Sequence, residues 1–217
     1  MISQPRTRKK IRFASLLKAV VAVAVLTTAL VGAEKPDTAY LEFVKRVNAG
    51  DASVDFRALR LACAKANKCD AKGENRDLIA MRRASQAHAY KEAAKIGEKL
   101  IAEGFPNIEA HAICADAYTA LNDPEKAKFH QAVTSGLIRS IMTTGDGKSK
   151  ESAFEVIGTH EEHVILNVLG LPAFGNQALM PGKPHSYDVI EVNDPKSGQK
   201  ISVYFNIDAF YPMKGLR

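Results

Sequence analysis

The segment His160-Glu161-Glu162-His163 comes closest to a chemical motif in this chain, because its histidines and carboxylates could hold a metal ion. In zinc metalloproteases the two histidines are four residues apart, and the glutamate that acts as the base follows the first one directly. Here they are three residues apart, a spacing at which helical side chains still share a face. Zinc or copper binding by His160 and His163 therefore stays open, with His185 as a third ligand if folding brings it near. The simpler interpretation is a pair of exposed histidines in the first turn of a helix.

Other catalytic motifs are incomplete. Gly147-Lys148-Ser149 resembles the end of a phosphate-binding loop, but that motif requires a glycine where this chain has Met142. A serine nucleophile would be expected in a Gly-x-Ser-x-Gly turn, which the sequence does not contain. Cys114 falls on the apolar face of a predicted helix, where a buried thiol is inert. We therefore predict no catalytic residue and no cofactor.

Four acidic residues near the C-terminus could gather at the edge of a sheet and bind a cation. Solvated strand faces and turns explain them more simply, because acidic side chains are mostly exposed. These residues are Asp188, Glu191, Asp194 and Asp208.

The three cysteines, Cys63, Cys69 and Cys114, allow one disulfide bond in an oxidising compartment. Within one helix, Cys63 and Cys69 would lie about 9 Å apart along the axis, which is too far for a bond. They can pair only if the helix ends near Ala66 and the chain turns back at Asn67–Lys68. Three unpaired buried thiols are the alternative. A zinc site is not indicated, since no second close pair of ligands accompanies these cysteines.

Residues 1–33 have the three parts of a secretory signal peptide. A basic head without acids precedes an apolar stretch from Ala19 to Ala33, which ends in the small residues of Val31-Gly32-Ala33. The stretch has about 15 residues, fewer than the ~20 that a permanent membrane-spanning helix needs. We therefore expect cleavage before Glu34 and a periplasmic or secreted protein without a stable membrane span. An uncleaved N-terminal anchor is the alternative.

The net charge of +6 comes entirely from residues 1–33. Six of the 30 Lys and Arg residues lie within residues 1–33, and none of the 24 Asp and Glu residues does. The chain from residue 34 onward thus carries equal numbers of basic and acidic residues. Because a nucleic-acid-binding domain normally keeps a basic surplus on its folded part, we expect no nucleic-acid partner.

Hydrophobic periodicity predicts helices over most of residues 37–143. Apolar residues recur at helical spacing in six segments, and residues that favour turns separate these segments. The predicted breaks include Ala49–Asp51, Ala71–Glu74, Gly104–Asn107 and Asn122–Pro124.

The segment from Ala110 to Ala127 resembles a tetratricopeptide repeat (TPR), because Tyr118 and Ala127 stand where that pattern expects them. Tyr90 to Ala93 resembles the second helix of an earlier copy. Ala127 follows Ala93 by 34 residues, which is the length of this repeat. With about one and a half copies visible, a long concave peptide groove is not implied.

Beyond Gly145-Asp146-Gly147 the apolar residues follow a period that favours strands. Residues 153–157 and 177–181 are short strand candidates. Residues 187–192 and 201–207 have the signature of a hairpin, with a turn at 193–198. In the last strand we expect an alternating set of side chains to face the core: Ile201, Val203, Phe205 and Ile207.

A helix is predicted between the first two of these strands. Thr159 and Glu162 have the spacing of a capping box, in which each side chain bonds the backbone N–H of the other residue. The helix then runs from Glu161 to Leu169, and Gly170 with the following residues closes it.

Short motifs spread over about residues 38–209 identify a family resemblance. They are Asp55-Phe56, Leu59-Arg60, Gly145-Asp146-Gly147, Ala153-Phe154, Val156-Ile157, Glu161-Glu162, Gln177-Ala178-Leu179, Tyr187-Asp188-Val189 and Tyr204-Phe205-Asn206-Ile207. On these motifs the chain resembles an uncharacterised bacterial exported family, a domain of unknown function with TPR-like helices before a small C-terminal α+β module. His163 departs from the resemblance, which expects an aromatic residue after the paired glutamates. The family brings no activity, cofactor or catalytic residue.

Together these features predict an α+β protein, with a TPR-like helical region over residues 34–143 and a small module over 144–217. The module is expected to hold a mostly antiparallel sheet and one helix. For function we favour a non-enzymatic extracytoplasmic protein that acts through contacts with another envelope or secreted protein. The alternatives are a metal-dependent hydrolase that uses His160 and His163, and a protein that binds small molecules or cell-wall fragments between the two parts. An enzyme should gather titratable groups in one cleft, whereas a scaffold should show an apolar patch.

Overall fold

The computed structural model of the chain describes residues 36–51, 53–69, 74–172 and 175–211. By their contacts, these described residues form one compact unit. The predicted signal peptide, residues 1–33, lies outside the described residues, and its cleavage stays a prediction. None of the described helices is both long and apolar enough to cross a membrane.

Six helices precede the sheet, at or close to the predicted positions. Asp55, Asn107 and Asp123 cap α2, α5 and α6, because each side chain accepts a hydrogen bond from the backbone N–H three residues later. The turn that pairing of Cys63 with Cys69 would require is also present, since Asn67 has a φ of +52° and the N–H of Lys68 donates to the carbonyl of Cys63. The bounds are α1 Pro36–Asn48, α2 Phe56–Lys65, α3 Glu74–Gln86, α4 Tyr90–Glu103, α5 Ile108–Ala120 and α6 Pro124–Met142.

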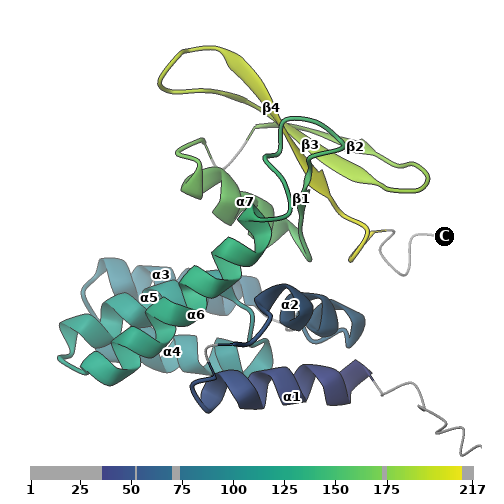
Figure 1. The fold of residues 1–217 in the computed structure, drawn as a ribbon. Coiled ribbons are helices and arrows are strands. Elements are labelled where there is room, and N and C mark those ends of the chain that lie inside the picture. Colours follow the sequence, from purple (N-terminus) through teal and green to yellow (C-terminus); the bar gives the residue numbers. More distant parts are fainter. Residues whose placement is uncertain (1–35, 52, 70–73, 173–174, 212–217) are drawn as a thin grey trace, which may run out of the picture. The chain divides into compact units, whose positions relative to one another are not determined.

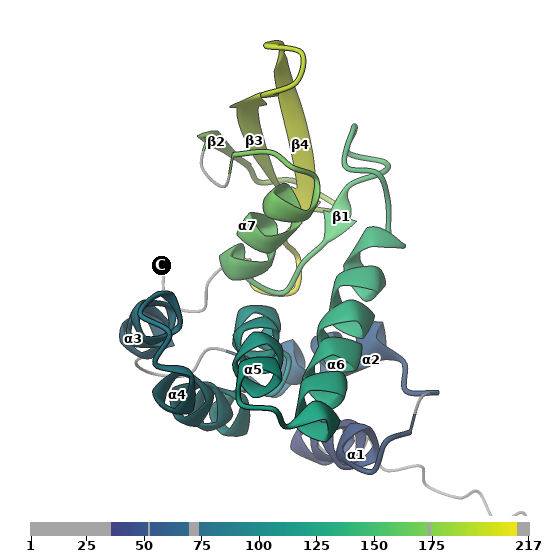
Figure 2. The same ribbon diagram turned by 90° about the vertical axis from the view of Figure 1, so that its left-hand side faces the viewer.

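Helices α3 to α6 pack in chain order, each against the next (Figures 1 and 2). Gly97 of α4 shows how close this packing is. A Cβ atom at Gly97 would lie 2.3 Å from Cε of Met81 and 2.4 Å from Sγ of Cys114. The small residue is therefore needed for α3, α4 and α5 to approach one another.

Helix α1 packs against α2, and α2 packs against α6. Tyr40 ties α1 to the loop after α4, because its hydroxyl accepts a hydrogen bond from the backbone N–H of Phe105 at 3.1 Å. This bond holds the first half of α1 beside the end of α4.

The C-terminal part contains a four-stranded sheet in the order β1-β4-β3-β2. The β3–β4 and β2–β3 pairs are antiparallel and the β1–β4 pair is parallel, so the last strand is internal. The predicted inward face is confirmed, because Val203, Phe205 and Ile207 are buried and Ile201 is half-buried. The strand bounds are β1 Phe154–Glu155, β2 Asn176–Met180, β3 Tyr187–Asn193 and β4 Lys200–Asn206.

Helix α7, Thr159–Val168, lies against one face of this sheet (Figures 1 and 2). The predicted capping box is wrong: Gly158 is the N-cap residue and makes no side-chain capping bond. Glu161 and Glu162 are fully buried, and the histidines beside them, His160 and His163, are half-buried rather than exposed as expected. Spacing alone suggested the cap, but α7 turns its first-turn carboxylates inward, where they meet α2 and β3 instead of its own backbone.

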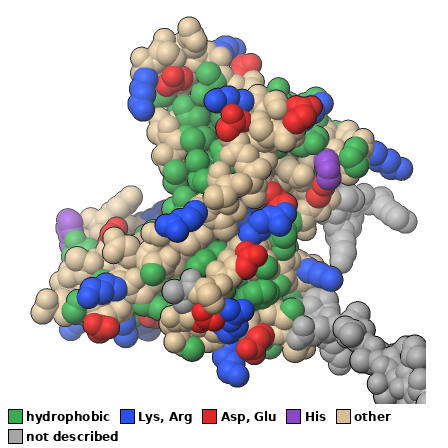
Figure 3. Space-filling view, viewed as in Figure 1, with side chains coloured by type: hydrophobic (Ala, Val, Ile, Leu, Met, Phe, Trp, Pro, Cys, Tyr) green, Lys and Arg blue, Asp and Glu red, His purple; other side chains and the backbone are tan. Residues whose placement is uncertain are grey.

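The order of helices and then sheet places the protein in the α+β class, as predicted. On the face drawn in Figure 3, Lys and Arg side chains are interspersed with Asp and Glu. That face therefore presents mixed charge, in agreement with the equal numbers of acidic and basic residues after residue 33.

Candidate functional site

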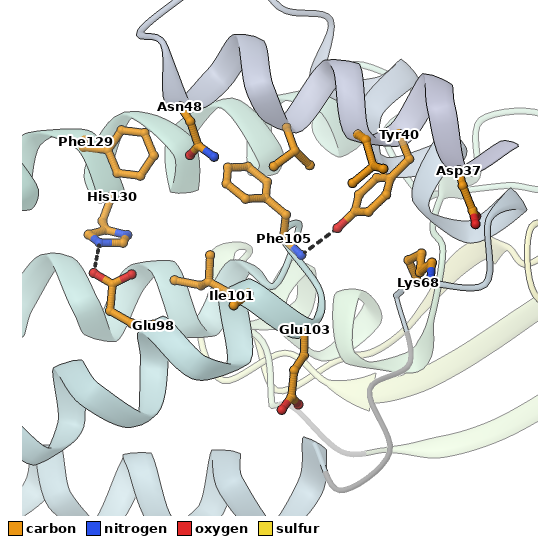
Figure 4. Close-up of a pocket in the computed structure, with 13 residues that line it drawn as sticks. Asp37, Tyr40, Asn48, Lys68, Glu98, Ile101, Glu103, Phe105, Phe129 and His130 are labelled. Atoms are coloured by element: carbon orange, nitrogen blue, oxygen red, sulfur yellow. Dashed lines mark hydrogen bonds and ion pairs between the residues drawn. The ribbon is translucent and has the colours of Figure 1, made fainter. Parts of the chain in front are cut away.

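A half-open groove of about 460 Å³ lies between α1 on one side and α4 and α6 on the other (Figure 4). This volume falls in the range of natural ligand pockets. Leu41 on α1 is 60% exposed at the rim of the groove, although it is a large apolar residue. The apolar and aromatic side chains of the walls are Tyr40, Leu41, Val44, Ile101, Ala102, Phe105 and Phe129.

One end of the groove holds His130 from α6 and Glu98 from α4 (Figure 4). His130 Nε2 lies 3.5 Å from Glu98 Oε1, and the imidazole is 2% exposed whereas the carboxylate side chain is 45% exposed. Tyr118 from α5 donates its hydroxyl hydrogen to Glu98 at 2.8 Å and stacks its ring on His130. Lys126 donates in turn to the Tyr118 oxygen at 3.3 Å. A ligand in the groove can therefore contact the Glu98 carboxylate, whose position is fixed by the hydrogen bond from Tyr118.

The proton positions on the two buried histidines follow from a backbone carbonyl. His111 Nε2 lies 2.9 Å from the oxygen of Phe105, which can only accept, so Nε2 carries the hydrogen. Burial, and then the nearby His130, lower the pKa of His111 to about 3, so its Nδ1 bears a lone pair. His130 Nδ1 lies 3.0 Å from His111 Nδ1 and donates its hydrogen to that lone pair. Burial also lowers the pKa of His130, although Glu98 opposes this, and the neutral ring leaves the lone pair on Nε2.

Away from His130, the groove is lined by more acidic than basic side chains. Asp37, Glu103 and Lys68 line it away from His130, and Figure 4 shows Asp37 and Lys68 near the opposite end. With Glu98, the lining contains three carboxylates and one ammonium group. The charged lining is therefore acidic.

A second group of titratable residues is buried where α2 meets α7. Arg60 is 0% exposed and donates to both oxygens of Glu161, at 2.8 Å and 2.5 Å, and to the backbone carbonyl of Glu155. Glu161 also accepts a hydrogen bond from the backbone N–H of Ile157 at 2.9 Å. A bidentate pair with these additional bonds is satisfied, so we assign it a structural role.

Glu162 and Asp188 are two further buried carboxyl groups, one on α7 and one on β3. Neither oxygen of Glu162, nor Oδ1 of Asp188, has a hydrogen-bond partner among the described residues. The other oxygen of Asp188 accepts from the side-chain amide of Gln177. Burial, followed by the charges of Asp188 and Glu161, raises the pKa of Glu162 to about 8. Glu162 is therefore protonated at neutral pH.

The candidate metal ligands lie in separate parts of the chain, one pair on α7 and the third in the loop before β3. His160 and His163 lie in the first turn of α7, whereas His185 precedes β3 and has its Nδ1 2.5 Å from Oδ2 of Asp208. Among the described residues, no three His, Cys, Asp or Glu side chains are grouped so that they could hold a metal ion. The three histidines are thus not brought together as a ligand set.

The four acidic residues near the C-terminus do not form one cluster either, since each has different surroundings. Asp188 is buried, Glu191 pairs with Lys200 across the hairpin, and Asp194 accepts bonds within its own turn. Asp208 accepts from the backbone N–H of Ser186 at 2.8 Å.

Cys63 and Cys69 are joined by a disulfide bond, with their Cα atoms 5.5 Å apart. The turn after Ala66 brings them together in the way the sequence required. Cys114 is buried and free, and burial raises the pKa of its thiol to about 12. Cys114 thus lies on a buried helix face, as expected, and its lack of reactivity stays a prediction.

One feature of the sequence does point to the groove. His130 continues the inward stripe of Val133, Leu137 and Ile141 on α6 at helical spacing, and all four residues are buried. A histidine on an apolar stripe must find partners inside the protein. No such signal marks Glu98, which reaches His130 only because α4 and α6 both pack against α5.

The helices and the four-stranded sheet define an α+β protein, and its ligand-sized groove lies among the helices. The chain belongs to the family described as Domain of unknown function (DUF4919), whose profile matches residues 37–214. This membership confirms the resemblance to a domain of unknown function. No curated protein and no solved structure is significantly similar to the chain.

Proposed function

We propose that this protein is a non-enzymatic, extracytoplasmic binding protein, and that the groove between α1 and α4–α6 holds a segment of another envelope or secreted polypeptide. The observation that carries the proposal is the groove itself, which combines apolar walls with a fixed polar end at His130 and Glu98. Recognition sites for ligands commonly combine a mainly apolar lining with a few placed polar groups.

The helical arrangement supports a polypeptide as the ligand. Ala93 and Ala127, at the 34-residue spacing of a TPR, lie on α4 and α6, the two helices that form one wall of the groove. On this basis we propose that α3–α4 and α5–α6 act as two TPR-like hairpins. Leu41, exposed on α1 at the rim, supplies an apolar contact for a bound chain.

Site-specific photo-crosslinking in the native envelope tests this function. A benzophenone amino acid at Leu41 should form a covalent adduct with a distinct polypeptide. The same amino acid at Glu42, which is exposed on α1 but does not line the groove, is the matched control. Ala102→Trp should abolish the adduct by filling the groove. An adduct that is equally strong from both positions, or unaffected by Ala102→Trp, would contradict the proposal.

We also propose that residues 1–33 are a cleaved export signal, which places the protein in the periplasm or outside the cell. The basic head, the short apolar stretch and the small residues before Glu34 support this. Mass spectrometry of the exported protein should find a chain that begins at Glu34, within a few residues. A chain that retains Met1 and fractionates with the membrane would instead identify an anchored protein.

A further inference from the structure

The polar end of the groove presents two hydrogen-bond acceptors and little to satisfy them from the groove side. His130 Nε2 bears a lone pair, because its Nδ1 donates to His111, and it faces a carboxylate oxygen of Glu98 at 3.5 Å. Two acceptors that face each other gain nothing from their contact. A donor that lies about 3 Å from both atoms would satisfy them together.

The charge and the walls of the groove select the kind of donor. Three carboxylates and one ammonium group line it, and Lys99 lies 3.9 Å from one of them, Glu103. Asp37 and Glu98 still outnumber Lys68, so a cationic donor is favoured over a neutral one. The aromatic rings of Tyr40, Phe105 and Phe129 line the groove as well, and aromatic rings attract cations. Apolar walls of this kind also suit the aliphatic stem of a long basic side chain.

The charged and titratable groups around the acceptor pair come from three helices. Tyr118 on α5 already donates to Glu98, and His111 on the same helix accepts from His130. Lys126 on α6 donates to the Tyr118 oxygen and so contacts this pair only by way of Tyr118. The side of Glu98 that faces the groove is thus left to a ligand, and His130 can accept only one more hydrogen bond.

From this arrangement we propose that the segment bound in the groove carries a basic group among apolar residues, and that this group donates to Glu98 and His130. A lysine or arginine side chain, or the ammonium group of a polypeptide N-terminus, has this chemistry. The proposal rests on the proposed function, because it names the partner of the same groove. Glu98 supplies the charge and His130 sets the direction of the hydrogen bond.

Fluorescence polarisation with three matched peptides tests the proposal on the purified protein. The probe is an N-acetylated, fluorescein-labelled octapeptide of leucine, phenylalanine and glycine with one central lysine. Two further peptides carry norleucine or glutamate at that position. We expect the lysine peptide to bind roughly tenfold more tightly than the norleucine peptide, which is the size of one charge-assisted hydrogen bond, and the glutamate peptide to bind most weakly.

Two substitutions on α4 supply the controls. Glu98→Gln keeps the size of the side chain and should remove the preference for lysine while leaving the norleucine peptide unaffected. Glu92→Gln, an exposed position that does not line the groove, should keep the full preference. Thermal melts of both variants check that they fold.

The outcomes separate this proposal from the proposed function. If all three peptides bind equally, and Ala102→Trp abolishes their binding, the groove holds a polypeptide but its preference for a basic group is overturned. If none of the peptides binds but the crosslink from Leu41 still forms, this inference is overturned and the proposed function stands. If the crosslink is also absent, the proposed function fails and this inference with it. Self-association of the protein that is lost in Glu98→Gln would identify a second copy as the occupant and overturn the inference of a separate partner.

Discussion

Glu162 makes the stability of this protein depend on pH. Its pKa is raised from the ordinary value of 4.5 to about 8, chiefly because the carboxyl group is buried. Between these two pH values the folded chain holds a proton that the unfolded chain has released. The stability that this proton provides is complete below pH 4.5 and is lost as the pH rises to about 8, by up to about 1.4 kcal/mol per pH unit.

Glu162→Gln should remove this dependence, because the amide stays neutral at every pH. As the pH rises from 5 to 8, the wild type should lose stability that the variant keeps. The difference in the free energy of unfolding between variant and wild type should therefore shift in favour of the variant by several kcal/mol. Urea unfolding at both pH values measures this, with Glu42→Gln on the exposed face of α1 as the control. A difference between variant and wild type that stays constant with pH would show that Glu162 is already ionised in the folded protein.

The cysteines give a second prediction at the residue scale. With Cys63 and Cys69 paired and Cys114 buried, the denatured and unreduced protein should react with one equivalent of a thiol reagent per chain. Cys114→Ser should then leave no reactive thiol. Three reactive thiols in the protein purified without reductant would mean that the pair does not form where the protein resides.

Within the elements, β4 gives the sharpest test of register. Phe205 is 0% exposed and lies beside Phe154 of β1, with ring centroids 6.1 Å apart, whereas Tyr204 points to the opposite face and is half-buried. Phe205→Ala should therefore lower the free energy of unfolding by about 3–5 kcal/mol, through lost burial and a residual cavity. Tyr204→Ala should cost clearly less. Urea melts compare the two, and a larger loss for Tyr204→Ala would exchange the faces, since neighbouring residues of a strand point in opposite directions.

Helix α7 shows how an element can be predicted correctly while its side chains are not. The segment is helical, as the sequence indicated, but its first turn points two carboxylates into the protein. Helical spacing specifies which residues share a face. It does not specify whether that face meets solvent or an arginine from another helix.

Over the whole molecule, the bond between Arg60 and Glu161 joins the helices to the C-terminal module across 101 positions of the sequence. Removing one partner of a buried ion pair leaves an unpaired charge. Arg60→Met should therefore lower the free energy of unfolding by about 3–5 kcal/mol, and Glu161→Leu in the same chain should restore part of the loss. Arg82→Met, which breaks the more exposed pair with Glu109, should cost about 1 kcal/mol or less.

The same melts show whether the two parts unfold together. Because a buried ion pair and shared core residues connect them, we expect a single cooperative transition in the wild type, seen at the same urea concentration by circular dichroism and by tyrosine fluorescence. Two separate transitions would instead establish residues 34–143 and 144–217 as independent domains.

Local chemistry determined much of this protein from its sequence alone. The caps of α2, α5 and α6, the turn at Asn67 and the alternation in β4 follow from neighbouring residues, and so the helices, the hairpin and the α+β class were predictable. The sequence left the disulfide open, because pairing required a turn at Asn67–Lys68 and three free thiols were the alternative.

Tertiary structure alone decided the chemistry of the interior and of the groove. His111, His130 and Glu98 come from three helices, and Arg60 binds Glu161, which lies 101 positions later in the sequence. Burial then sets which of these groups carry charge, as the pKa of Glu162 shows. Periodicity specifies which residues share a face, but it contains no information about which faces meet. The partners of these buried polar groups depend on which helix and strand faces pack together.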